Sequence, residues 1–203
     1  MSRAGDARAG EPGRPGGPEP VRLAVIIGST REGRAGEAVA HWFAARARRR
    51  DDLAVDVVDL AEFTFPPRYP CAVTPPVAAF TGRIELADAF AVVTPEYNHS
   101  FPASLKQAID YAYDEWRAKP VGFVAYGHRS QGFHAIEHLR TVFTELHMVT
   151  VRGRVTFDLL DCGDGARPPD DGAAARDAGA MLDQLTWWAL ALREARAVRP
   201  YVS

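Results

Sequence analysis

Residues 23–36 bring together the residue types that bind a phosphate group. They read LAVIIGSTREGRAG: an apolar run ends at a glycine and continues into two hydroxyl residues and two arginines. The glycine lets the chain turn off a strand, and the helix that follows offers free backbone N–H groups and the positive end of its dipole. Arg31 and Arg34 add forked donors that suit a phosphate dianion. The stretch therefore predicts an anion-binding loop that includes Ser29 and Gly36.

This loop differs from the two most common nucleotide-binding loops. Only one glycine directly follows the apolar run, so GxGxxG is absent, and no Gly-Lys-Ser/Thr closes the loop as in a P-loop. NAD and ATP bound in those two ways are therefore disfavoured. Two arginines beside a Ser/Thr turn suit a terminal monophosphate, which concentrates its charge more than a pyrophosphate diester does. The alternative is a strand–turn–helix connection whose arginines are only solvated.

A second candidate loop, TPEYNHSFPAS at 94–104, follows another apolar run. Its prolines stiffen the backbone, Tyr97 could stack on a flat heteroaromatic ring, and Asn98 favours the turn. The alternative is an ordinary turn that leads into a helix, with Glu96 solvated. The candidate ligand-binding residues of this loop are Pro95, Glu96, Tyr97, Asn98 and His99.

Strand and helix patterns alternate along the chain that carries these loops. Apolar β-branched runs predict strands, and amphipathic stretches predict helices. The expected strands are 21–27, 53–60, 87–93, 120–126 and 149–155. The expected helices are 36–50, 77–86, 104–116, 133–146 and 173–197, with long loops at 63–76 and 158–172.

This alternation predicts an α/β fold, a parallel sheet with helices on both faces. Five strands fit a flavodoxin-like doubly wound sheet of order 2-1-3-4-5 better than a six-stranded dinucleotide fold or an eight-stranded barrel. Ligands of such sheets bind at the carboxyl ends of the strands, where the strand order reverses. We therefore expect the loops after the first, third and fourth strands to converge on one site.

Composition and charge limit the classes of protein that fit. The 203 residues carry a formal net charge of -2 and are 47% hydrophobic and 25% charged, which is ordinary for one soluble globular domain. Neither nucleic acid nor a membrane is an expected partner. Residues 1–20 are rich in Gly, Pro and Arg and predict a disordered tail rather than a secretory signal. We therefore expect one domain over 21–198 and a cytoplasmic location.

The first two loops, at their separation, resemble the NADPH-dependent FMN reductase family of flavodoxin-like proteins. GSTREGR at 28–34 is similar to the family's FMN-phosphate loop. PEYN at 95–98, followed by LKQAID at 105–110, is similar to its flavin-ring loop and the helix behind it. The similarity runs from about residue 21 to residue 155. The resemblance implies that Ser29, Arg31 and Arg34 hold the FMN phosphate, and that residues 95–98 line the isoalloxazine.

The same resemblance implies a function. It implies an FMN-dependent oxidoreductase that passes a hydride from NADPH or NADH through bound FMN to a small acceptor, such as a quinone, an azo compound or free flavin. Because the cofactor does the chemistry, no catalytic side chain is expected. The resemblance also implies a homodimer or homotetramer, with the flavin near a subunit interface. The sequence names neither the acceptor nor the preferred nucleotide.

The third loop, YGHRSQGFHA at 126–135, departs from the family's pattern. His128 and Gln131 stand where the family usually has glycine, and His134 stands where arginine is usual. Side chains at these positions narrow the gap to the flavin and disfavour a positive φ. Either the loop bends differently and still binds FMN, or the affinity for flavin is reduced. The expected cofactor-binding residues here are Gly127, Ser130, Gln131 and Gly132.

Two other functions remain as alternatives. One is a flavodoxin-type FMN electron carrier, although the near-neutral charge and the two arginines of the first loop argue against it. The other is a flavin-free descendant with a scaffolding or regulatory role. No metal site is expected from His99, His128 and His134, because they lie in or beside loops and show no HxxxH spacing among themselves. A histidine that donates a proton near the flavin is a further alternative.

Overall fold

Five parallel strands form one sheet of order β2-β1-β3-β4-β5. The computed structural model describes residues 19–159 and 172–202. The strands are β1 (Val21–Ile27), β2 (Leu53–Asp59), β3 (Ala89–Pro95), β4 (Pro120–Gly127) and β5 (Val149–Asp158). The α-helices are α1 (Gly36–Ala47), α2 (Pro75–Leu86), α3 (Ala103–Tyr111), α4 (Phe133–Glu145) and α5 (Ala173–Val198), and the 3-10 helices are η1 (Leu60–Glu62) and η2 (Asp114–Trp116). The predicted fold class and strand order are confirmed.

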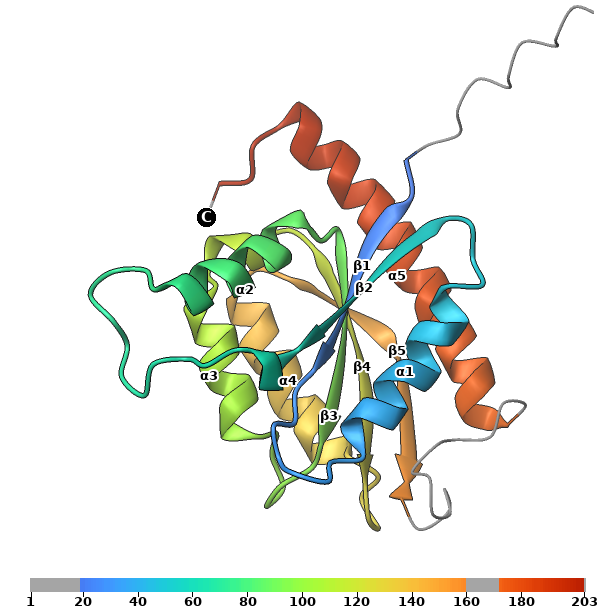
Figure 1. The fold of residues 1–203 in the computed structure, drawn as a ribbon. Coiled ribbons are helices and arrows are strands. Elements are labelled where there is room, and N and C mark those ends of the chain that lie inside the picture. Colours follow the sequence, from blue (N-terminus) through green and yellow to red (C-terminus); the bar gives the residue numbers. More distant parts are fainter. Residues whose placement is uncertain (1–18, 160–171, 203) are drawn as a thin grey trace, which may run out of the picture.

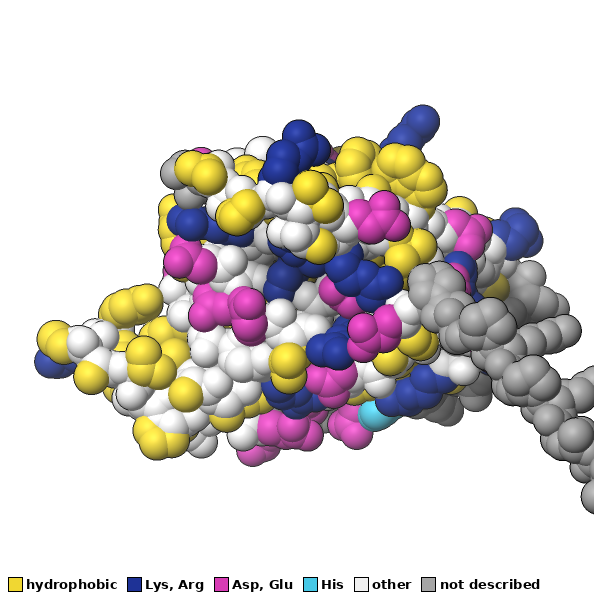
Figure 2. Space-filling model, turned by 90° about the horizontal axis from the view of Figure 1, so that it is seen from above, with side chains coloured by type: hydrophobic (Ala, Val, Ile, Leu, Met, Phe, Trp, Pro, Cys, Tyr) yellow, Lys and Arg dark blue, Asp and Glu magenta, His cyan; other side chains and the backbone are white. Residues whose placement is uncertain are grey.

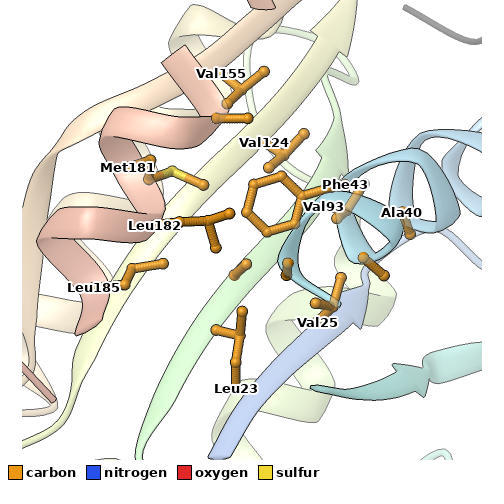
Figure 3. Packing of buried hydrophobic residues seen from close by; sticks show 14 of the residues in the cluster. Leu23, Val25, Ala40, Phe43, Val93, Val124, Val155, Met181, Leu182 and Leu185 are labelled. Atoms are coloured by element: carbon orange, nitrogen blue, oxygen red, sulfur yellow. The ribbon is translucent and has the colours of Figure 1, made fainter. Parts of the chain in front are cut away.

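Helices cover both faces of the sheet. Helices α1 and α5 lie on one face, and α2, α3 and α4 lie on the other (Figure 1). On the first face, Phe43 of α1 and Met181 of α5 point toward the strands (Figure 3). On the second face, the ring of Trp116 contacts those of Phe90 and Phe143 at centroid distances of 4.8 and 5.5 Å. The two apolar layers together form the core.

The position of each strand in the sheet explains its sequence. Every residue of β3 and β4 is buried, because helices cover both sides of these inner strands. Their apolar runs are accordingly continuous. Strand β2 lies at an edge, and its burial alternates along Leu53–Asp59. The continuous and the alternating apolar patterns therefore follow from the central and edge positions of these strands.

The structure corrects several predicted boundaries. Helix α2 begins at Pro75, two residues before the predicted start, because prolines fit the first turn of a helix, where no N–H partner is needed. The predicted helix 104–116 ends at Tyr111 and continues as the separate turn η2. This break lets Trp116 turn into the core, where its Nε1 donates to the carbonyl of Ile109 at 3.1 Å. Strand β2 ends at Asp59, whose carboxylate caps η1.

Some predictions lie outside the described residues. Residues 1–18 of the expected disordered tail are outside the described part of the chain, and so is most of the expected loop at 158–172. The division into a tail and one domain over 21–198 stays a prediction. Among the described residues, no helix is both long enough and apolar enough to cross a membrane.

The carboxyl ends of β1, β3 and β4 lie together at one end of the sheet (Figure 1). The opposite end is seen in Figure 2, where basic and acidic side chains lie intermixed across the middle of the face. The three loops of interest follow β1, β3 and β4, so the fold collects them at the first of these ends.

Candidate functional site

A cavity of about 440 Å³ lies at the carboxyl ends of β1, β3 and β4. All three candidate loops contribute to it, although they are far apart in the sequence. Its lining contains seven predicted site residues: Ser29, Arg31, Arg34, Pro95, Glu96, Tyr97 and Gly127. The lining also contains Glu32, Gly33, Ala35, Tyr126, His128 and Leu159. The predicted residues Gly36, Asn98, His99, Ser130, Gln131 and Gly132 lie close by in the sequence but are not part of its lining.

A second cavity, of about 360 Å³, lies between the edge of the sheet and α2. Its walls come from β1, β2 and the end of α2, and apolar surface dominates them. None of the predicted site residues lines it. The convergence of three polar loops therefore makes the cavity at the strand ends the stronger candidate.

The loop after β1 presents free backbone donors. Within the part of the chain that the structure describes, the N–H groups of residues 29–33 donate no hydrogen bond. Ser29 is 1% exposed, and its Oγ lies 3.3 Å from the Tyr97 hydroxyl, which joins the first loop to the second. Free N–H groups ahead of a helix form an anion-binding cradle.

Gly28 is required by space rather than by its φ angle. A Cβ at this position would lie 2.9 Å from Cδ2 of Leu105 and 3.1 Å from the carbonyl oxygen of Val93. Gly28 does not have a positive φ, so the backbone freedom of glycine is not what this position requires. The expectation that this position needs a glycine was right, but the reason is the lack of space for a Cβ. The glycine lets β1 pass close to α3 and β3.

The two arginines of the first loop have different roles. Arg34 is 12% exposed on its side chain, forms an ion pair with Asp59 of β2, and donates to the Ser29 carbonyl at 2.8 Å. Arg31 is exposed, lines the cavity, and has no hydrogen bond or ion pair to any described residue. Arg34 therefore holds the loop in place, while Arg31 keeps its donors for a ligand.

Tyr126 forms part of the cavity lining that sequence analysis did not identify. It is the penultimate residue of the inner strand β4, it is 3% exposed, and its ring stacks on Phe157. Burial raises the pKa of its phenol well above the ordinary value, and a hydrogen bond with Ser29 opposes this only in part. A Cβ at Gly36 would lie 2.6 Å from the phenol oxygen, so only glycine fits there. The raised pKa keeps the phenol protonated. The signal in the sequence that could have identified Tyr126 as a site residue is its position near the carboxyl end of an expected strand.

The loop after β3 makes a tight turn. Tyr97 and Ser100 exchange backbone hydrogen bonds of 2.7 and 2.9 Å, and the central residues Asn98 and His99 have φ of 50° and 62°. Two positive φ values are typical of a type I′ turn, which asparagine favours at its first central position. Asn98 shapes the turn as predicted. The turn presents Tyr97, 37% exposed, to the cavity.

The loop after β4 accommodates its unusual residues. Gln131 takes a φ of 52°, and its N–H donates to the His128 carbonyl at 2.7 Å. His128 needs no positive φ; its side chain is 68% exposed. Gly132 has a φ of 84°, and a Cβ there would lie 2.5 Å from Cβ of Ala125. The loop therefore bends with a strained glutamine and leaves the cavity open.

Glu96 ties the second loop to the third. Its carboxylate accepts from the His134 backbone N–H at 3.1 Å and lies 3.1 Å from Nδ1 of the same residue. Burial alone would raise the pKa of Glu96, but hydrogen bonds from the side chains of Ser130 and His134 and from the His134 N–H outweigh burial and lower it. The Glu96 side chain is 7% exposed, so this carboxylate is a buried connection between the loops rather than a solvated one.

The arrangement suits a ligand with an anionic end and a flat ring. Free N–H groups and Arg31 lie at the β1 side of the cavity, and Pro95 and Tyr97 lie at the β3 side. The first set binds phosphate oxygens, and the second offers aromatic and apolar contact. The donor set therefore fits FMN.

The fold and this cavity define the chain as a flavodoxin-like protein, in which the ligand site lies where the strand order reverses between β1 and β3. The chain belongs to the NADPH-dependent FMN reductase family, whose model matches residues 21–159. This match confirms the resemblance seen in the sequence.

Individual relatives agree with this assignment. An NAD(P)H-dependent FMN reductase of a Nectria species is 27% identical over 188 residues, which cover 81% of this chain and 92% of the relative. An NAD(P)H:quinone oxidoreductase of Solanum tuberosum is 31% identical over 144 residues, which cover 64% and 71% of the two chains. The solved structure of the flavoenzyme NAD(P)H:(acceptor) oxidoreductase FerB from Paracoccus denitrificans has a TM-score of 0.69 at 21% identity and covers 84% of this chain and 97% of its own. That structure supports the fold.

Proposed function

We propose that this protein is an FMN-dependent NAD(P)H oxidoreductase that reduces a small acceptor such as a quinone. The observation that carries the proposal is that groups suited to a phosphate and groups suited to a flat ring line the same cavity. Among the described residues, the Arg31 side chain and the N–H groups of Ser29 and residues 31–33 have no partner, and these residues line the same cavity as Pro95 and Tyr97. A phosphate joined to a flat ring satisfies both, and family membership supports FMN as that ligand.

In this proposal, each loop has a defined part. The first loop holds the phosphate through Ser29, Arg31 and the backbone of residues 29–33, with Gly36 opening the helix. Arg34 contributes by fixing the loop through Asp59 and the Ser29 carbonyl. The ring is flanked by the proposed residues that line the cavity: Pro95, Glu96, Tyr97 and Gly127. The other proposed residues, Asn98, His99, Ser130, Gln131 and Gly132, shape the turns beside them.

Bound FMN supplies the hydride transfer between NAD(P)H and the acceptor. The chain's own residues bind and orient. The Tyr126 phenol stays neutral and offers a donor beside Ser29. The Glu96 carboxylate keeps the second loop against the third through His134. These fixed groups mean that little reorganisation accompanies binding.

The proposal extends to the acceptor and the assembly. Quinone reductases occur among the named relatives, so quinones are the first acceptors to test, with azo compounds and free flavin after them. Either NADPH or NADH is the electron donor. We further propose a homodimer or homotetramer that works in the cytoplasm.

The decisive experiment is FMN titration followed by anaerobic reduction. We expect the purified protein to quench FMN fluorescence at one flavin per chain, and NADPH or NADH to bleach the yellow holoprotein without oxygen. Adding a quinone should then restore the yellow colour. A protein that ignores added FMN is a flavin-free descendant, and a holoprotein that binds FMN but resists both nucleotides is an electron carrier. Either result would refute the proposal.

A further inference from the structure

A cluster of two histidines and one carboxylate lies beside the cavity. Glu96 directly after β3, His99 in the following turn and His134 in the first turn of α4 each place one ligand atom within 4.8 Å of the other two. Sequence analysis considered His99, His128 and His134 and expected no metal site, because they lie in or beside loops without HxxxH spacing, and it did not consider Glu96 as a ligand. We propose that Glu96, His99 and His134 form a binding site for one divalent transition-metal ion of the Zn²⁺ type.

The chemistry of the three side chains suits such an ion. Imidazole nitrogens and carboxylate oxygens are preferred ligands of Zn²⁺, and three protein ligands leave a fourth position for water or another ligand. The Glu96 side chain is 7% exposed, whereas that of His134 is 44% exposed and His99 lies in an exposed turn. The carboxylate therefore lies at the base of the site, and the imidazoles remain open to solvent.

The distance between the first two ligands is already suitable. Oε1 of Glu96 and Nδ1 of His134 lie 3.1 Å apart. Two ligand atoms about 2.0–2.1 Å from a tetrahedral Zn²⁺ are separated by roughly 3.3 Å. An ion can thus replace the hydrogen that these two atoms share, with only a small shift of the side chains. The main-chain N–H of His134 continues to hold the other carboxylate oxygen.

His99 must turn to complete the site. Its ring stacks on that of His134 with centroids 4.3 Å apart and planes inclined by 6°. An imidazole binds a metal in its own ring plane, so two parallel stacked rings cannot both bind one ion without rotation. His99 is free to rotate because it is the second central residue of the exposed Tyr97–Ser100 turn. Metal binding would therefore exchange the ring stack for a bridge between the turn and α4.

This bridge would act next to the cavity, because Glu96 belongs to the cavity lining. The inference does not depend on the proposed flavin chemistry, since all three ligands belong to the chain. Helix α4 carries a further histidine, His138, one turn after His134, and its Nδ1 lies 3.0 Å from Oγ of Ser100. The His134–His138 spacing of i, i+4 is a sequence signal for metal binding that sequence analysis overlooked.

The test is calorimetric titration of the protein, without any histidine tag, with ZnCl₂, both with and without FMN. We expect one ion per chain. The substitutions Glu96→Gln, His99→Ala and His134→Ala should each weaken binding by about tenfold or more. His41→Ala, which removes an exposed histidine of α1, is the matched control and should bind as the wild type does. Co²⁺ in place of Zn²⁺ should give visible d–d absorption that the three substitutions remove.

His99→Ala keeps the test informative even where the other two substitutions disturb the loops, because His99 makes no contact with the core. Circular dichroism verifies that each variant is folded. Absence of stoichiometric Zn²⁺ binding, or equal affinity in His99→Ala and the wild type, would overturn the proposal. In that case the cluster is a hydrogen-bonded connection between two loops and nothing more.

Discussion

Arg31 and Arg34 lie three residues apart, yet only one of them is available to a ligand. The guanidinium of Arg34 is committed to Asp59 and to the Ser29 carbonyl, whereas Arg31 has no partner among the described residues. Sequence reasoning treated the two as equivalent donors. A buried ion pair and a free exposed cation respond differently to removal.

We predict that Arg31→Ala lowers FMN affinity without loss of stability. The loss of one charge-assisted hydrogen-bond donor is expected to cost about 1.5–3 kcal/mol of binding free energy, or about tenfold to a hundredfold in Kd. Arg34→Ala should instead lower the free energy of unfolding by about 1–3 kcal/mol, because it leaves Asp59 without its partner. Fluorescence titration and chemical denaturation of both variants measure the difference. Equal effects of the two substitutions would contradict the division of roles.

Gly33 and Gly132 both have positive φ, at 64° and 84°, but their surroundings differ. A Cβ at Gly33 meets no atom within 4 Å, whereas one at Gly132 would lie 2.5 Å from Cβ of Ala125. We predict that Gly33→Ala costs only the strain of the left-handed conformation, about 1–2 kcal/mol. Gly132→Ala should cost about 3 kcal/mol or more, because a steric clash is added to that strain. Thermal and chemical denaturation compare them, and a similar loss in both would show that the loop after β4 relaxes.

Residues 63–74 form a proline-rich segment that projects from the body of the molecule (Figures 1 and 2). The segment is anchored to α3, where the Pro66 carbonyl accepts from the Tyr111 hydroxyl at 2.7 Å and from Nε2 of Gln107 at 2.9 Å. Tyr69, 73% exposed, stacks on Tyr111 with centroids 5.3 Å apart. None of residues 63–74 lines the cavity at the strand ends.

We predict that Tyr111→Phe loosens this segment. The substitution removes one hydrogen bond, which is worth about 1 kcal/mol, and leaves the ring stack intact. Arg68 is exposed and precedes Tyr69, so trypsin can cut between them. Limited proteolysis should therefore cleave Tyr111→Phe faster after Arg68 than the wild type. Tyr113→Phe is the control, since Tyr113 lies outside this contact, and equal cleavage rates in all three proteins would show that Tyr111 is no anchor.

The end of the sheet opposite the cavity contains a buried cation. Lys119 is 5% exposed, and its Nζ donates to the carbonyls of Ile84 at 3.1 Å and Glu85 at 2.9 Å, at the C-terminal end of α2. Burial lowers the pKa of Lys119 to about 8, although attraction to Glu85 partly opposes it. The charged ammonium therefore costs folding free energy at neutral pH, even though it satisfies two helix carbonyls.

We predict that the stability of the whole molecule rises as the pH increases from about 8 to about 10.5. In this window the unfolded chain, with the ordinary lysine pKa of 10.5, binds the proton that the folded chain has released, so the free energy of unfolding increases with pH. Each pH unit contributes up to about 1.4 kcal/mol, and the full window on the order of 3 kcal/mol. Other groups also titrate there, so the quantity to measure is the difference between the wild type and Lys119→Met in chemical denaturation. A difference that stays constant with pH would refute the prediction.

Much of the fold could be predicted because its signals are local. The continuous apolar runs of β3 and β4 and the apolar faces of α1 and α3 come from the one-dimensional pattern of buried positions. The breaks were harder to predict. The turn that carries Trp116 leaves the helical path because the indole is buried against Phe90, a contact across 26 positions that no local pattern contains.

The sequence alone was sufficient to predict the alternation of strands and helices and the loops that follow the strands, because these depend on residue types at short spacing. The strand order was predicted by matching five strands to a known fold class, and the family was predicted from the resemblance of two loop motifs. The three-dimensional contacts were needed to distinguish the role of Arg31 from that of Arg34, because Arg34 forms its ion pair with Asp59, which belongs to β2. They also revealed Tyr126 in the cavity lining and brought Glu96, His99 and His134 together. Those relations join side chains from different strands and helices, and only the packing of the sheet and its helices sets the distances between them.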